Sequence, residues 1–193
     1  MSGVRGAVVA FADESGSSAL RDPDTYLMAA VLIPDSQHDE ARAIMSSLKH
    51  RGERKLHWYD ENETTRSRIA ETIGAMSLPS IVVVRSQTGE REERKRRKCL
   101  EQLLVSLDDA GVVQLNLESR GKQQDDRDMG LVQVLRSQKV LSGELRVDHL
   151  PGPTEPLLWI ADSICGAYVS LRIGEQSHWQ HVEQTSTILD VQI

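Results

Sequence analysis

The chain has 193 residues, which is the length of one domain that can bury a hydrophobic core. Its residues are 39% hydrophobic and 27% charged, and the net charge of −6 argues against a protein that coats nucleic acid through a uniformly basic surface. Two cysteines without paired Cys/His spacing argue against a structural zinc site, and we expect a reduced, cytoplasmic protein without a signal peptide or a membrane span.

The first part of the chain is predicted to contain two strands followed by two helices. Residues 4–12 form a valine-rich run typical of a central strand, and residues 25–33 form a second run, so a hairpin is expected. Two helices are predicted from apolar residues at helical spacing. The first has Ala41, Ile44, Met45 and Leu48 on one face, and the second runs from a cap at Asn62 through Ile69, Ile73 and Met76.

The middle of the chain alternates strands and helices. Residues 81–85 predict a third strand, and residues 90–110 predict a helix with a leucine face and an opposite basic face. The basic face, which we interpret as solvated, consists of Arg91, Arg94, Lys95 and Lys98. Residues 112–117 predict a fourth strand that ends at Glu118, and residues 121–128 are expected to form a hydrophilic loop.

The C-terminal part continues this alternation. Residues 129–141 predict a helix with Leu131, Val134 and Leu135 inward, and residues 144–150 predict a fifth strand. Pro156 fits the start of a helix that runs to Ile173, and residues 187–193 could add a strand. The order of elements implies one α/β domain over residues 1–193 with a mixed five-stranded sheet, helices on its faces and a helical insertion at about 36–78.

Three carboxylates accompany apolar segments that are predicted to be buried. Asp13 ends the first strand, Glu118 ends the fourth, and Asp162 lies on a helix that is apolar nearly all round. An ionised carboxylate in such a place is costly unless it is hydrogen-bonded or binds a cation. Hard divalent cations prefer oxygen ligands, so the three acids suggest a site for Mg²⁺ or Mn²⁺. The alternatives are a turn cap at Asp13, an ion pair of Glu118 with a nearby arginine, and a core hydrogen bond of Asp162.

Parts of the chain resemble the DUF3800 family of bacterial and phage proteins. The segments are VVAFADESG at residues 8–16, LHW at 56–58 and LRVDHLPGPTEPLLWIADSICGA at 145–167, and the likeness spans most of residues 8–170. It implies a ribonuclease H-like fold with helices on both faces of the sheet, and a metal-dependent, nuclease-like active site.

The same resemblance implies roles for particular residues. Asp13, Glu118 and Asp162 would be the catalytic and metal-binding residues, and Asp148 stands where the family's late strand often has an aspartate. Related nucleases often place a further acid or histidine near the last of these aspartates, whereas the next turn here offers Cys165 and Gly166. A fourth ligand would then come from Glu14, from Asp148 or from residues 121–128, or the site would be incomplete.

Several other residues are candidates beside this cluster. Glu14 is a secondary candidate, although side-chain alternation along a strand turns it away from Asp13. His57 could contact substrate or move a proton, or it could be an ordinary loop histidine. Arg120 and Lys122 follow Glu118 closely and are predicted to contact substrate phosphate.

Two functions are therefore open at this point. One is a Mg²⁺- or Mn²⁺-dependent nuclease that hydrolyses phosphodiester bonds in nucleic acid, with RNA and DNA unresolved as substrates. The other is a binding or regulatory module that keeps the ribonuclease H-like fold without turnover. The sequence gives no oligomeric state, and the absence of GxSxG and glycine-rich phosphate motifs argues against acyl transfer and nucleotide hydrolysis.

Overall fold

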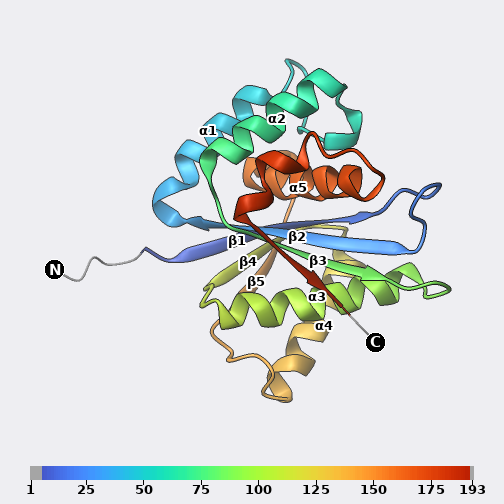
Figure 1. Ribbon diagram of the computed structural model, residues 1–193. Coiled ribbons are helices and arrows are strands. Elements are labelled where there is room, and N and C mark those ends of the chain that lie inside the picture. The colour runs from blue at the N-terminus through green and yellow to red at the C-terminus, as the bar shows by residue number, and fades with distance from the viewer. Residues whose placement is uncertain (1–5, 192–193) are drawn as a thin grey trace.

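The computed structural model describes residues 6–191, which form a mixed sheet between two layers of helices (Figure 1). The strands are β1 (Val8–Gly16), β2 (Thr25–Pro34), β3 (Ser80–Ser86), β4 (Gln114–Glu118), β5 (Arg146–Leu150) and β6 (Ser186–Asp190). The helices are α1 (His38–Leu48), α2 (Glu63–Met76), α3 (Glu92–Asp109), α4 (Lys122–Ser137) and α5 (Pro156–Arg172). No helix within residues 6–191 is both long and apolar enough to span a membrane.

The sheet has the strand order β5-β4-β1-β2-β3-β6. β1, β2 and β3 pair in antiparallel fashion, which confirms the predicted hairpin, whereas β4 runs parallel to β1 and β5 runs parallel to β4. The prediction of five strands is wrong, because β6 pairs in parallel with the outer edge of β3. The sixth strand contains most of residues 187–193, the segment that could add a strand according to the sequence. Residues 192 and 193 lie outside the described part of the chain.

Two hydrophobic layers form because β1 alternates its side chains between the faces of the sheet. Val9 and Phe11 pack in one layer together with residues of α1, α2 and α5, whereas Ala10 and Ala12 pack in the other with residues of α3 and α4. Helices therefore cover both faces, as predicted, with α1, α2 and α5 on one side and α3 and α4 on the other (Figure 1). Asp13 continues the alternation from Phe11 and belongs to the side of α5.

Helix α5 is buried along most of its length. Residues 157–170 are all buried, since the helix lies between β1 and the pair α1 and α2. Pro156 occupies its first turn, where the missing amide hydrogen costs nothing, and the side chain of Glu155 accepts a hydrogen bond from the amide of Leu157. A polar residue on this helix, such as Asp162, is therefore inside the protein whichever way it points.

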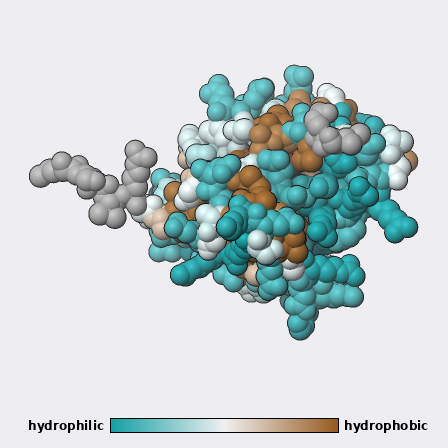
Figure 2. Space-filling model, turned by 90° about the horizontal axis from the view of Figure 1, so that it is seen from below, coloured by the Kyte–Doolittle hydropathy of each residue, from teal (hydrophilic) through white to brown (hydrophobic). Residues whose placement is uncertain are grey.

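Three predictions for α3 and α4 are corrected by the structure. Residues 121–128 are not a loop, because α4 already begins at Lys122. Val134 is 42% exposed, and Val132 is buried beside Leu131 and Leu135. The basic stripe on α3 is not uniformly solvated: the side chain of Lys95 is buried and lies 3.8 Å from Asp24. Viewed from the side of these helices, the surface is still mostly hydrophilic (Figure 2).

Candidate active site

Parallel pairing of β1 and β4 places Asp13 beside Glu118. The last paired residues of the two strands are Ala12 and Leu117, and each acid is the next residue along its strand. Neighbouring strands lie about 4.8 Å apart, and both acids project to the sheet face that α5 covers. Asp162 on α5 completes the group, since its negative charge and that of Glu118 both act on Asp13. The structure thus brings together three acids that are far apart in the sequence.

The carboxyl group of Asp13 lies in an environment that disfavours its charged form. Burial, together with repulsion from Asp162 and Glu118, raises its pKa from the ordinary value of 3.8 to about 8. The backbone amide of Glu14 donates a hydrogen bond of 2.8 Å to Oδ1 of Asp13, and this bond and the charge of Lys55 act in the opposite direction. A cation placed among these oxygens would remove the repulsion.

Asp162 is held by the segment that precedes α2. Its Oδ2 accepts a hydrogen bond of 2.8 Å from the backbone amide of Trp58, and Nε2 of His57 lies 3.9 Å from Oδ1. Burial raises the pKa of Asp162, while the Trp58 amide and the charges of His57 and Lys55 lower it. The structure therefore places His57 beside the acids, and the core hydrogen bond considered for Asp162 comes from a backbone amide.

Glu118 already has a cationic partner, which sequence reasoning did not identify. Nζ of Lys55 donates hydrogen bonds to both carboxylate oxygens of Glu118, at 2.8 and 3.1 Å. Burial lowers the pKa of Lys55, but the hydrogen bonds and charge of Glu118 outweigh it and leave this pKa above its ordinary value. On the other side, a Cβ at Gly152 would collide with the Glu118 carboxylate, so a side chain at position 152 would force that carboxylate to shift.

The carboxylates of the three acids do not surround a single position that would fit a metal ion. Within residues 6–191, no three His, Cys, Asp or Glu side chains form a preassembled metal cluster. The donor set itself suits a hard divalent ion, because it consists of carboxylates whose mutual repulsion such an ion would relieve. The charge of Glu118 is already compensated by Lys55, and the assignment of Asp13, Glu118 and Asp162 as metal ligands is a prediction.

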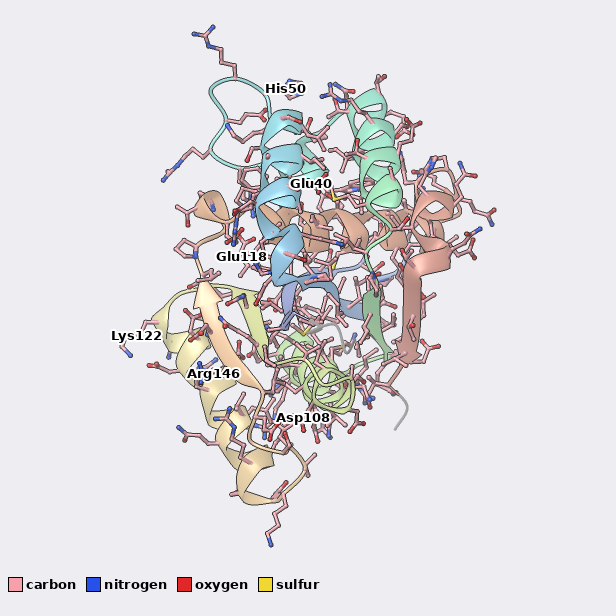
Figure 3. All side chains as sticks on the ribbon, turned by 90° about the vertical axis from the view of Figure 1, so that its left-hand side faces the viewer. Glu40, His50, Asp108, Glu118, Lys122 and Arg146 are labelled. Carbon is pink, nitrogen blue, oxygen red and sulfur yellow. The ribbon has the colours of Figure 1, made fainter. Side chains whose placement is uncertain are left out.

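The remaining candidates lie elsewhere. Glu14 is turned to the opposite face of the sheet, where its carboxylate pairs with Arg96 at 2.6 Å and with Arg120 at 3.0 Å. Asp148 lies on β5, and its carboxylate accepts a hydrogen bond of 3.2 Å from the side chain of Gln114. Lys122 projects into solvent at the start of α4, where it pairs with Asp126 (Figure 3). None of these contacts joins the cluster around Asp13.

Gly166 explains how Trp58 reaches its place against α5. A Cβ at this glycine would collide with the indole ring, so the absence of a side chain lets Trp58 pack closely enough to present its amide to Asp162. Trp58 is 1% exposed, and an edge contact with His178, at 5.0 Å between the ring centroids, adds to its packing. The helical turn after Asp162, which contains no further acid or histidine, thus has a packing role through Gly166.

We expect Gly166→Ala to lower the free energy of unfolding by about 1–3 kcal/mol, because the added methyl group overpacks the contact with Trp58. Gly130→Ala on α4 is the matched control, since a Cβ there meets no atom within 4 Å. The control should be stabilised by up to about 1 kcal/mol, because alanine favours the helix. Urea unfolding measures both values, and equal effects of the two substitutions would contradict the proposed packing role.

The pKa of Asp13 predicts a pH dependence of stability in EDTA. Between the ordinary pKa of 3.8 and the native pKa of about 8, the native state holds a proton that the unfolded state has lost, so stability decreases as pH rises through this range. Asp13→Asn removes this dependence. Relative to the parent, the variant should therefore gain at least about 1 kcal/mol between about pH 5 and pH 8. Urea unfolding at the two pH values measures it, and a constant difference would contradict the pKa.

The chain matches no protein-family model and no curated protein. Among solved structures it is similar to an RNase HII from Archaeoglobus fulgidus, solved with PCNA, with a TM-score of 0.56 and 14% identity over 92% of this chain and 77% of that one. It is also similar to Bst-RNase HIII solved with Mn²⁺, with a TM-score of 0.53 and 18% identity over 94% of this chain. The chain spans only 55% of that RNase HIII chain.

These similarities define the class of fold. The protein has a ribonuclease H-type fold, with the acid cluster near the carboxyl ends of two parallel strands and on the helix that crosses them. The identities are too low to carry an activity from those enzymes to this chain, and the resemblance to the DUF3800 family stays a prediction.

Proposed function

We propose that this protein is a divalent-metal-dependent nuclease that hydrolyses phosphodiester bonds in nucleic acid. The observation that supports it most is the convergence of Asp13, Glu118 and Asp162 at one end of the sheet, where burial and mutual repulsion raise the pKa of Asp13 to about 8. Such an arrangement is unfavourable in the free protein and favourable around a cation. The Mn²⁺ complex of the similar RNase HIII agrees with this choice of ion.

The residues of the site would divide the work as follows. Asp13, Glu118 and Asp162 would hold Mg²⁺ or Mn²⁺, which supplies charge for the phosphoryl oxygens and lowers the pKa of an attacking water. The amide of Trp58 fixes the carboxylate of Asp162, and the amide of Glu14 fixes that of Asp13. His57, whose Nε2 lies 3.9 Å from Oδ1 of Asp162, would be placed to accept or donate a proton in the reaction.

The test is a cleavage assay on a panel of single-stranded RNA, single-stranded DNA and RNA–DNA hybrid. Cleavage is expected with Mg²⁺ and Mn²⁺ and only poorly with Ca²⁺, because magnesium imposes near-octahedral geometry and retains water molecules, whereas the calcium shell is looser. If every substrate stays intact with Mn²⁺ at several pH values, the nuclease proposal is wrong.

A noncatalytic module with the same fold is the second candidate. The observation in its favour is the Lys55 ammonium group, which already neutralises Glu118 without any metal. Calorimetric titration with Mn²⁺ separates the candidates. Binding of two ions that is lost in Asp13→Asn favours the enzyme, whereas one ion or none, together with an intact substrate panel, favours the module.

A further inference from the structure

A strongly basic loop lies next to the acid cluster. Residues 49–55, with the sequence KHRGERK, follow α1 and are called the basic loop below; in Figure 3 His50 marks its place. The loop contains four Lys or Arg residues and one Glu, a net charge of +3, in a chain whose total is −6. The rest of the protein therefore has a net charge of −9, so the basic loop is a local concentration of positive charge in an acidic protein.

The charges of the basic loop are largely available to a ligand. Arg51 and Arg54 are exposed, and within residues 6–191 neither side chain has an acidic partner. The one acid of the loop, Glu53, is turned back on the loop itself, where its carboxylate accepts a hydrogen bond of 3.1 Å from the amide of His50. The side chains of Arg51 and Arg54 therefore face solvent, whereas the one acidic side chain of the loop forms a hydrogen bond within it.

Lys55 connects the basic loop to the acids. Its ammonium group contacts both oxygens of Glu118, and its charge also acts on Asp13 and Asp162. The residues predicted to contact phosphate are engaged differently: Arg120 pairs with Glu14 at 3.0 Å, and Lys122 pairs with Asp126 at 2.7 Å. Of these basic groups, Lys55 is the one whose contact would be broken if Glu118 turned to a metal ion.

We propose that the basic loop binds the phosphate backbone of a nucleic-acid strand, and that Lys55 leaves Glu118 for a substrate phosphate when a divalent ion enters the site. The inference rests on the nuclease function proposed above. While the site holds no metal, Lys55 compensates the charge of Glu118. Once an ion takes over this task, the displaced ammonium group lies at the border between the acids and the loop, where it can contact a phosphate of the bound strand.

Lys55→Gln and Lys55→Arg test the exchange through metal affinity, without relying on cleavage. Removal of a competing, hydrogen-bonded charge should make Mn²⁺ bind about tenfold more tightly to Lys55→Gln in calorimetry. Lys55→Arg keeps the charge and should bind Mn²⁺ like the parent. Lys98→Gln is the matched control, because it removes the same charge from α3, where Lys98 pairs with Glu101. Thermal unfolding checks that each variant is folded.

Nucleic-acid affinity tests the second half of the proposal. Fluorescence anisotropy with single-stranded RNA and DNA in Ca²⁺ should show weaker binding for Lys55→Gln and for Arg51→Gln/Arg54→Gln. The slope of log affinity against log salt should become shallower by about one for each phosphate group that the variant no longer neutralises. Unchanged slopes in both variants would overturn the basic loop as the binding surface.

The outcomes for the metal also separate this inference from the nuclease function. If the parent and Lys55→Gln bind Mn²⁺ equally well, the exchange is overturned while the nuclease function stands. If neither binds Mn²⁺, both are overturned. Tighter binding in Lys55→Gln alone, with Lys55→Arg and Lys98→Gln like the parent, supports the exchange.

Discussion

Asp13→Asn is expected to reduce phosphodiester cleavage by at least about 10³-fold, since loss of metal stabilisation costs several kcal/mol of the barrier and 1.36 kcal/mol is a factor of ten. Asp13 is the acid on which the charges of Asp162 and Glu118 both act, so the amide removes the charge at the centre of the cluster. Nucleic-acid affinity should stay within about threefold of the parent, because phosphate contacts rather than the acid provide binding. Cleavage rates and anisotropy on the same substrate measure the two quantities.

Asp109→Asn is the matched control for this substitution, because it makes the same chemical change at an exposed position at the end of α3. It should cleave like the parent. Cleavage that survives Asp13→Asn would point to a contaminating nuclease or to a different site in this protein. A loss of both cleavage and binding would instead indicate that Asp13 is needed for the folded state, which thermal unfolding in EDTA would reveal independently.

The elements that position the acids were predictable from the sequence. The apolar run at residues 8–12 identifies β1 as a buried strand, and residues 112–117 identify β4. The expectation that Asp13 ends the first strand is wrong, because β1 continues to Gly16, whereas Glu118 is the last residue of β4. Asp162 stood out because nearly every neighbour on α5 is apolar. The alternation of side chains also placed Glu14 on the opposite face from Asp13, as the structure shows.

The partners of these acids were not predictable in the same way. Lys55 meets Glu118 across 63 positions of the chain, and nothing in its own segment distinguishes it from the solvated charges around it. The Trp58 amide that binds Asp162 is a backbone group, so the type of residue at this position does not indicate the contact. Such contacts depend on where a loop folds, which periodicity does not specify.

Buried ion pairs in α3 and α4 also could not be recognised from the sequence, because they too depend on contacts between distant segments. Arg96 and Asp128 look like ordinary surface charges in the sequence, yet each is buried and their contact joins the two helices. Opposite charges that satisfy each other inside a protein give the same local pattern as solvated ones. The hydrophilic stretch at 121–128 was therefore predicted as a loop, although most of it is the first part of α4.

Arg96 is the centre of a charged network beneath β1. Its guanidinium group contacts the two carboxylate oxygens of Asp128 at 2.6 and 2.8 Å and the carboxylate of Glu14 at 2.6 Å. Nε2 of His149 lies 3.2 Å from the same Asp128 carboxylate. Burial raises the pKa of Asp128, but hydrogen bonds from His149 and Arg96 lower it below its ordinary value. The network holds the part of β1 that carries Glu14, next to Asp13, against α3 and α4.

Arg96→Met is expected to lower the free energy of unfolding at pH 7 by about 3–5 kcal/mol, because removal of one partner leaves a buried carboxylate without compensation. Arg94→Met on the same helix is the matched control. Its side chain is 73% exposed and pairs with Glu90, so the loss should stay below about 1 kcal/mol. Urea unfolding measures both. Equal losses in the two variants would contradict a stabilising role of the buried network.

The same variant should also show how Asp128 depends on pH. Since the native pKa of Asp128 lies below the unfolded value of 3.8, its contribution is present above that value and is lost as pH falls through the native pKa. Without Arg96, this pKa should no longer be held down, so the parent should lose more stability on acidification than Arg96→Met does. The difference between them is therefore expected to shrink below about pH 4. A difference that stays constant from pH 7 to about pH 3 would show that Arg96 stabilises the protein through packing of its side chain and not through its charge.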